Sequence, residues 1–195
     1  MIDAVITWVD GKDPRHREKR MKYASAGQLK SDDKAGETRY ADLGEIFWCV
    51  ASLNRYAPWL NKIYIVTDEQ DPGLDAFLER NFPEGYIPVE IVDHKVLFKG
   101  YEDCLPTFNS VSIESMTWRI PGLSDRFLEF NDDLMLLAPV APEDFFLPDG
   151  TPVGEKEFGW KQGCDDKGTA DECGYACWGP HVVHKAGSLP EGVET

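Results

Sequence analysis

The sequence predicts an α/β fold in which helices flank a mostly parallel β-sheet. Four short, almost continuously apolar segments alternate with segments whose apolar residues recur at helical spacing. Continuous apolar strands are typical of a parallel sheet that is covered on both faces. Because each crossover in such a sheet should be right-handed, the alternation indicates one layered α/β domain.

The first strand is expected at residues 2–9, where the apolar run IDAVITWV leads into the sequence DGKDP. Gly11 and Pro14 favour a turn at that point. Residues 15–30 are basic and compatible with a helix, and residues 31–38 are polar. This connection is long for a compact domain, and such connections are often functional lids or disordered segments.

The later elements alternate in the same way. Apolar residues at helical spacing predict a helix at residues 42–56, and Pro58 ends it. Pro88 favours an edge position for the third strand, because proline cannot donate a hydrogen bond to a neighbouring strand. In chain order, the other expected elements are a strand at 62–67, a helix at 74–81, a strand at 87–92, a helix at 107–118 and a strand that begins at residue 126.

Composition limits the classes of function. With 195 residues, of which 42% are hydrophobic, the chain is long enough for one globular domain. A formal charge of −15 argues against nucleic acid as a partner, because phosphate backbones require a basic face. The sequence has no apolar run near the ~18 residues that a membrane span needs, and no apolar leader. An odd number of cysteines then favours a reducing, cytoplasmic compartment, with peripheral association at the inner face of the membrane as the alternative.

All four expected strands end in polar or acidic residues. Ligands of parallel sheets bind beyond the carboxyl ends of the strands, at the point where the strand order reverses. A single acidic strand end is usually an ordinary turn. Four polar or acidic strand ends along one edge of the sheet, which we call the rim, indicate a binding site. In chain order, these ends carry Asp10 and Asp13; Thr67 and Asp68; Asp93, His94 and Lys95; and Asn131, Asp132 and Asp133.

Asp132 and Asp133 carry the strongest chemical signal on that rim. Adjacent carboxylates after a buried strand suit Mg²⁺ or Mn²⁺, which typically use one or two carboxylates together with substrate phosphates. A spare carboxylate or a histidine can accept the proton of an attacking hydroxyl. The structural alternative is that the pair only opens a turn. The sequence contains no P-loop and no dinucleotide-binding glycine motif, which disfavours a P-loop NTPase and a dinucleotide oxidoreductase.

Several candidate residues also have a purely structural interpretation. His94 could be an ordinary loop histidine. Asn109 and Ser110 could cap the helix that follows them, and Glu114 could face solvent. Arg119 could neutralise a helix dipole.

Two segments are expected to be peripheral to the rim. Lys12, His16 and the basic residues 15–22 favour a solvated face over a substrate clamp. From residue 151 onward the chain becomes rich in glycine, and its cysteines and histidines have spacings that could ligate zinc. Because these spacings contain no Cys-x-x-Cys pair, the zinc signal is weak. The residues concerned are Cys164, Cys173, Cys177, His181 and His184.

Longer stretches also match known motifs. Residues 2–14, IDAVITWVDGKDP, resemble the first conserved region of the Stealth family, and residues 39–68 resemble the start of its second region. The second match continues through VDHK at residues 92–95 to FNDD at residues 130–133. Long motifs in this order are specific, and they cover the chain to about residue 150. Stealth proteins are sugar-phosphate transferases of bacterial capsule assembly, related to the N-acetylglucosamine-1-phosphotransferase of animals.

The resemblance implies a nucleotide-sugar transferase architecture of the GT-A or Rossmann type. It implies transfer of a hexose-1-phosphate, such as N-acetylglucosamine-1-phosphate, from a UDP-sugar to a sugar hydroxyl of a capsular polysaccharide or exopolysaccharide acceptor, with release of UMP. Residues 1–150 would form the nucleotide-sugar-binding catalytic domain. Residues 151–195 would form a glycine- and cysteine-rich extension that includes a truncated third region.

The resemblance and the rim together define the expected site. Asp132 and Asp133 would bind Mg²⁺ or Mn²⁺ or abstract the acceptor proton, and the two roles cannot be divided between them. His181, in a segment that loosely resembles the third region, is the further catalytic candidate. The residues expected to bind substrate are Asp10, Gly11, Asp68, His94, Asn109, Ser110, Glu114, Arg119 and Asn131.

The sequence departs from the family pattern in its last part. The fourth conserved region is missing, so we expect a fragment, a minimal variant or a catalytically incomplete chain. Two other functions stay open. One is a metal-dependent glycosyltransferase that releases UDP, and the other is a non-catalytic domain that binds a nucleotide sugar.

Overall fold

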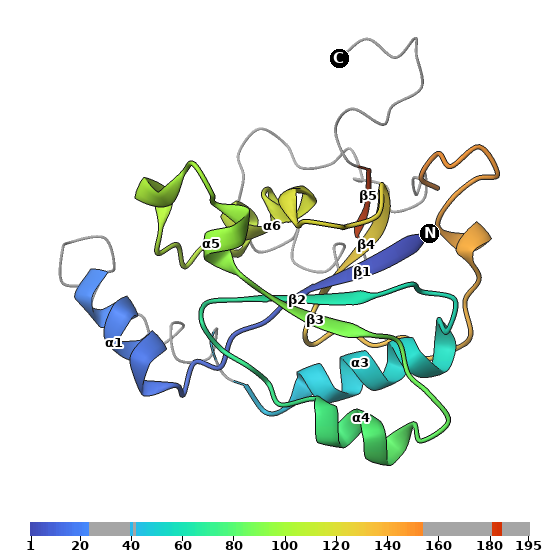
Figure 1. Cartoon of the computed structure of the whole chain (residues 1–195), viewed down its shortest axis with the longest axis horizontal. Coiled ribbons are helices and arrows are strands. Elements are labelled where there is room, and N and C mark those ends of the chain that lie inside the picture. The colour runs from blue at the N-terminus through green and yellow to red at the C-terminus, as the bar shows by residue number, and fades with distance from the viewer. Residues whose placement is uncertain (24–39, 41, 154–180, 185–195) are drawn as a thin grey trace, which may run out of the picture.

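The structure, a computed structural model, describes residues 1–23, 40 and 42–153, and the backbone of residues 181–184. A central β-sheet lies between two layers of helices, with α3 and α4 on one face and α5 and α6 on the other (Figure 1). The strands are β1 (Ile2–Thr7), β2 (Ile63–Thr67), β3 (Val89–Asp93), β4 (Arg126–Asn131) and β5 (His181–His184). The helices are α1 (Pro14–Tyr23), α3 (Glu45–Tyr56), α4 (Asp75–Asn81), α5 (His94–Leu97) and α6 (Ser110–Glu114), with short 3-10 turns η2 (Glu102–Cys104), η3 (Thr117–Arg119) and η4 (Pro142–Asp144).

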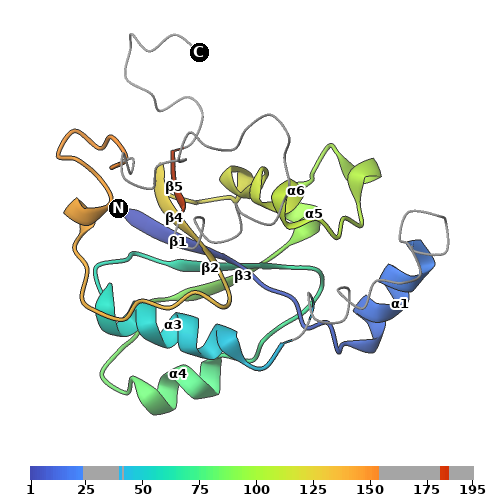
Figure 2. The ribbon, with the colours of Figure 1, turned by 180° about the vertical axis from the view of Figure 1, so that it is seen from behind.

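The strand order is β3-β2-β1-β4-β5, and the first four strands in that order are parallel. The chain builds outward from β1 through β2 to β3 and then returns to place β4 on the other side of β1. The strand order therefore reverses between β1 and β4, and the view from behind shows these two strands side by side (Figure 2). The predicted α/β fold with a mostly parallel sheet and flanking helices is confirmed.

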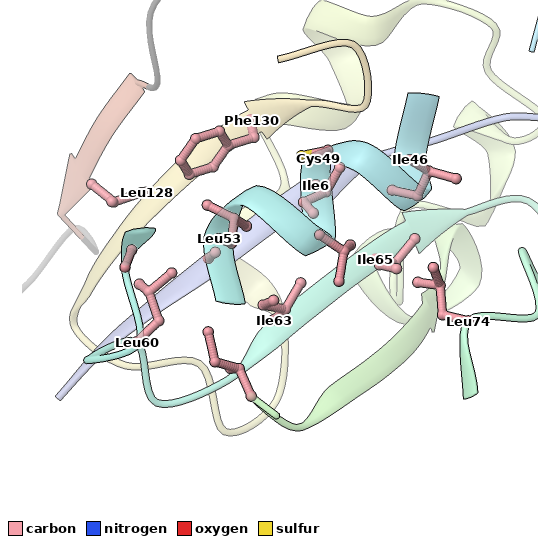
Figure 3. Packing of buried hydrophobic residues seen from close by; sticks show 14 of the residues in the cluster. Ile6, Ile46, Cys49, Leu53, Leu60, Ile63, Ile65, Leu74, Leu128 and Phe130 are labelled. Atoms are coloured by element: carbon pink, nitrogen blue, oxygen red, sulfur yellow. The ribbon is translucent and has the colours of Figure 1, made fainter. Parts of the chain in front are cut away.

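Two apolar clusters hold the layers together. One lies between the sheet and the α3–α4 layer, where Ile6 and Ile65 of the sheet pack with Ile46 and Leu53 of α3 (Figure 3). The other covers the opposite face and includes Val5 of β1. Because β1 is buried on both faces, its sequence is mostly apolar and does not alternate, with Asp3 as a buried polar exception.

Some element bounds differ from the expected ones. The helix expected at 107–118 is the short α6 followed by η3. The α-helix ends at Glu114 with Ser115 as its C-cap, and Met116, with φ −114° and ψ −4°, is the N-cap of η3. Strand β3 lies at the sheet edge, as Pro88 predicts, and the Pro88 carbonyl still accepts from the Ile63 amide at 2.9 Å. Strand β5, which was not expected, pairs antiparallel with β4 at the other edge. None of the described helices is long and apolar enough to cross a bilayer.

Candidate active site

A cavity of about 390 Å³ opens at the carboxyl ends of β1 and β4, where the strand order reverses. Its wall is formed by the carboxyl ends of β1, β2, β3 and β4, by the start of α1, and by the segment that leads into α6. This is the position at which open α/β sheets bind ligands. Its lining residues are Thr7, Trp8, Val9, His16, Tyr40, Val66, Asp68, His94, Thr107, Phe108, Ser110, Ile113, Asn131, Asp132 and Asp133.

The end of β4 supplies the acidic part of the cavity wall. The Leu134 amide donates to the Asn131 carbonyl at 3.1 Å, so that the chain turns and leaves Asp132 and Asp133 at the cavity. Burial and the adjacent Asp133 carboxylate raise the pKa of Asp132 to about 7. A carboxyl group with such a pKa exchanges its proton near neutral pH.

Two buried nitrogen atoms on the cavity wall have no hydrogen-bond partner among the described residues. They are Nε1 of Trp8, whose side chain is 8% exposed, and Nδ1 of His16, which is 5% exposed. A buried polar atom without a partner costs roughly 1–3 kcal/mol, and such atoms are rare unless a ligand or water completes them. Both residues line the cavity, although the two nitrogen atoms themselves have almost no accessible surface, so a water or a ligand polar group would have to reach them to complete them.

The expectation that His16 lies on a solvated face is wrong. Its ring packs against Tyr40 and Phe108, with both centroid distances at 5.6 Å. Burial, followed by the nearby Arg20 charge, lowers the pKa of His16. Lys12 and Arg15 are exposed to solvent, as expected. His16 is buried because it lies on the face of α1 that turns toward the cavity.

Gly11 is required for the wall of the cavity. A Cβ atom at this position would lie 2.0 Å from the Tyr40 carbonyl oxygen, which is far inside van der Waals contact. Tyr40 closes one side of the cavity, and its hydroxyl donates to the Phe108 carbonyl at 3.0 Å. Asp10 does not line the cavity; its carboxylate accepts from the Lys12 amide at 2.8 Å and shapes the same turn.

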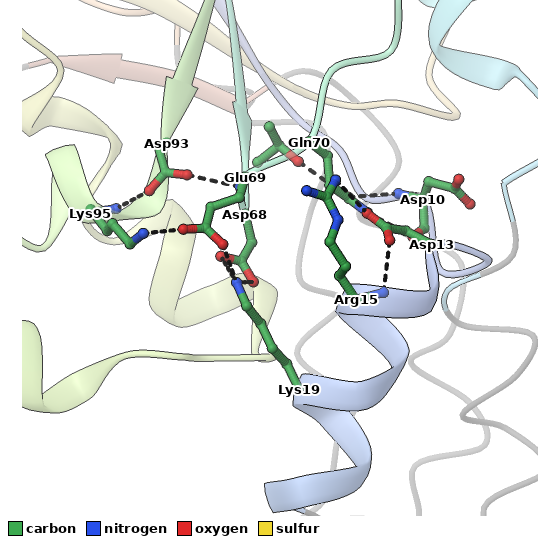
Figure 4. Close-up of polar contacts among 10 residues, drawn as sticks. Asp10, Asp13, Arg15, Lys19, Asp68, Glu69, Gln70, Asp93 and Lys95 are labelled. Atoms are coloured by element: carbon green, nitrogen blue, oxygen red, sulfur yellow. Dashed lines mark hydrogen bonds and ion pairs between the residues drawn. The ribbon is translucent and has the colours of Figure 1, made fainter.

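An ion-pair network fastens α1 to the ends of β2 and β3 (Figure 4). Lys19 Nζ lies 3.0 Å from Asp68 and 2.8 Å from Glu69, and Lys95 also contacts Glu69. These two cations lower the pKa of Glu69 to about 2. The Glu69 amide in turn donates to Asp93 at 2.8 Å. The network holds Asp68 at the cavity with its charge already paired.

The segment after β3 contributes two of the predicted residues to the cavity and leaves others outside. His94 is buried on the cavity wall, and burial lowers its pKa. Ser110 also lines the cavity. Asn109 instead caps α6, where its side chain accepts from the Val111 amide at 3.0 Å. Glu114 borders a smaller hollow between β1 and β4.

Arg119 lies outside the cavity and ties two backbone segments together. Its guanidinium donates to the Leu97 carbonyl at 2.7 Å and to the Lys99 carbonyl at 2.6 Å. It also lies over the rings of Tyr101 and Trp118, at 5.1 and 6.0 Å from their centroids. These contacts stabilise the connection between α5 and η3.

The tail residues are only partly described. The backbone of His181 pairs with Glu129 in the β4–β5 ladder, two residues before Asn131. His181 therefore begins β5 at the end nearest the carboxyl end of β4. Cys164, Cys173 and Cys177, on which the zinc prediction depends, lie outside the described residues.

The donor set at the end of β4 fits a hard divalent cation. Within the described part of the chain, no three histidine, cysteine or acidic side chains form a complete metal cage. Mg²⁺ and Mn²⁺ do not require one, since they bind through one or two carboxylates with waters and substrate phosphates as the other ligands. Asp132 and Asp133 provide such a pair, and the mutual repulsion that raises the Asp132 pKa would be relieved by a cation.

Sequence reasoning missed Trp8, Tyr40, Thr107 and Phe108 as cavity residues. The sequence contained one indication for Trp8, because an indole N–H near an acidic strand end is energetically unfavourable to bury without a hydrogen-bond partner. The other three stand in connecting segments, and only the fold brings them to the strand ends.

Comparison with known proteins assigns the chain to a family. Residues 2–28 match "Stealth protein CR1, conserved region 1", and residues 39–153 match "Stealth protein CR2, conserved region 2". The capsular polysaccharide phosphotransferase WcwK of Streptococcus pneumoniae is 41% identical over 152 residues, which cover 77% of this chain and 43% of WcwK. An exopolysaccharide phosphotransferase of Streptomyces coelicolor is 41% identical over 150 residues, which cover 77% of this chain and 26% of the relative.

A third relative extends the comparison to another kind of polysaccharide. The receptor polysaccharide phosphotransferase WefC of Streptococcus oralis is 41% identical over 152 residues, which cover 77% of this chain and 43% of WefC. The chain thus spans less than half the length of each of these relatives. Since the second conserved region alone matches more than half of the chain, this protein belongs to the Stealth family.

Proposed function

We propose that this chain carries the donor site of a sugar-phosphate transferase that acts in capsular polysaccharide or exopolysaccharide synthesis. The reaction moves a hexose-1-phosphate unit, such as N-acetylglucosamine-1-phosphate, from a UDP-sugar to a sugar hydroxyl and releases UMP. The observation that carries this proposal is the cavity at the strand-order reversal, which places two adjacent carboxylates beside Trp8 and His16, whose buried nitrogen atoms lack partners among the described residues. The named activities of the relatives support it.

The residues of the cavity have complementary tasks in this reaction. Trp8 Nε1 can only donate, so it would bind an acceptor oxygen of the donor. Asp132 and Asp133 would together hold Mg²⁺ or Mn²⁺ and accept the proton of the attacking hydroxyl. The bound cation would neutralise charge on the diphosphate of the donor. His94 and Ser110 would contact the donor, and His181 is the further catalytic candidate from β5.

We also propose a cytoplasmic site of action, which the odd number of cysteines in the sequence favours.

The deciding experiment identifies the released nucleotide. Purified protein is incubated with Mg²⁺ or Mn²⁺, a panel of UDP-sugars and an oligosaccharide acceptor, and the products are separated by chromatography. We expect UMP. Release of UDP would instead show glycosyl transfer, and donor binding with no release under any condition would show a non-catalytic binding domain.

A further inference from the structure

A second hollow, of about 530 Å³, lies beside the cavity and has no part in the roles assigned above. Its wall is formed by η2, α6 and η3. Thr107 lines both the hollow and the cavity, so the two adjoin at that residue. Asp132 and Asp133 line the same cavity as Thr107.

Two large aromatic side chains of the hollow are exposed to solvent. Tyr101 is 57% exposed and Trp118 is 44% exposed. Single exposed aromatic residues are ordinary, but two that share one concave surface indicate a binding surface. We call the hollow with these two rings the aromatic platform.

The aromatic platform is held in place by hydrogen bonds. Arg119 lies over both rings while its guanidinium is fixed by the Leu97 and Lys99 carbonyls. The indole Nε1 of Trp118 donates to the Ser115 carbonyl at 3.0 Å. Rings that are fixed before binding lose little conformational entropy when a ligand stacks on them.

The chemistry of the surface fits a saccharide. The C–H face of a pyranose packs on an aromatic ring, while its hydroxyls need hydrogen-bond partners at the edge of the ring. The hydroxyls of Ser112 and Ser115 and the guanidinium of Arg119 line the same hollow and provide such partners. Ser115 and Arg119 already donate to backbone carbonyls, and their remaining hydrogen-bonding capacity at the hollow suits hydroxyl groups better than an apolar partner.

We propose that the aromatic platform binds a saccharide unit of the acceptor and directs an acceptor hydroxyl past Thr107 to the cavity. This inference depends on the proposed function, because it assigns the acceptor to a surface adjacent to the donor site. Saccharide binding itself can nevertheless be measured without any turnover.

The test compares saccharide binding and donor binding in the same protein. Wild type, Tyr101→Ala/Trp118→Ala, the conservative Trp118→Phe and the control Trp48→Ala are titrated separately with chitotetraose, cellotetraose and UDP-N-acetylglucosamine, and binding is followed by NMR chemical-shift changes. Trp48 is a matched control because it is 65% exposed and lies on α3, on the other face of the sheet. We expect the double variant to lose about tenfold or more in saccharide affinity, with UDP-sugar affinity unchanged. Trp118→Phe should retain most of the saccharide affinity, and Trp48→Ala all of it.

Three results would overturn the inference. Wild type could bind neither saccharide at millimolar concentration, the double variant could bind as well as wild type, or the double variant could lose thermal stability while its saccharide affinity stays the same. The last result would show that the rings serve packing. Failure of the proposed function would look different, since wild type would then bind saccharide but no UDP-sugar.

Discussion

The two ends of the parallel sheet differ in the hydrogen bonding of their buried polar groups. At the amino end, Asp3 of β1 is completely buried, and its two oxygens accept from Asn61 Nδ2 at 2.8 Å and from the Ser124 amide at 2.7 Å. At the carboxyl end, Trp8 and His16 present buried nitrogen atoms that have no partner among the described residues. The polar groups of Asp3 are satisfied within the protein, whereas those two nitrogen atoms at the carboxyl end would need a ligand or a water to satisfy them.

The largest difference in the rate of nucleotide release should appear between variants that neutralise acidic residues at opposite ends of β4. Asp132→Asn and Asp133→Asn should each reduce nucleotide release by roughly 100-fold or more, because they remove a proton acceptor or cation ligand. Asp125→Asn, at the exposed amino end of the same strand, should leave the rate unchanged. Nucleotide release measures the effect, with circular dichroism as a check of folding. Full activity in both Asp132→Asn and Asp133→Asn would remove this pair from the site.

Asp3 should contribute to stability and not to ligand binding. Asp3→Ala removes the acceptor of two part-buried hydrogen bonds, from the Asn61 side-chain amide and the Ser124 N–H, which should lower the free energy of unfolding by about 1–3 kcal/mol. Urea denaturation measures the loss. UDP-sugar affinity of the folded fraction should stay at the wild-type value. A variant that is stable but binds donor poorly would contradict the division between the two ends.

Trp8 should show the opposite behaviour. Trp8→Phe keeps an aromatic ring but removes the unpartnered N–H, so the free protein should be as stable as wild type or slightly more stable. Donor affinity should fall about tenfold, which corresponds to one lost hydrogen bond of ~1.4 kcal/mol. Calorimetric titration with UDP-sugar measures the affinity, and Trp48→Phe is the control. Unchanged affinity would show that water, and not the donor, completes this group.

A smaller effect on the free energy of unfolding is expected from pH. Burial lowers the pKa of His94 below its ordinary value of 6.5, although Asp68 and Asp93 oppose the shift and His16 and Lys19 add to it. The unfolded chain therefore binds the proton first as pH falls, so the contribution of His94 to stability is complete above pH 6.5 and is lost below it. His94→Gln should reduce this loss when urea denaturation is compared across that pH range. An unaltered pH profile would assign the loss to other groups.

The sequence by itself determined the layers of the fold and the acidic side of the site, which Asp132 and Asp133 form. Continuous apolar strands and helical spacing depend on local sequence, so they predict a parallel sheet with helices on both faces. The placement of Asp132 and Asp133 at a strand end follows in the same way. Pro88 even predicts which strand lies at an edge, because a missing N–H is tolerated only there.

Only the tertiary structure decided which residues meet. The reversal of strand order between β1 and β4 depends on long-range pairing and cannot be read from periodicity. It brings His16 and Tyr40 to the same cavity as Asp132, and it turns one histidine of a basic helix inward. The tertiary structure also places Arg119 beside the exposed ring of Tyr101. The physical reason is that burial and hydrogen-bond partners are properties of packed surfaces, which residues far apart in the chain form together.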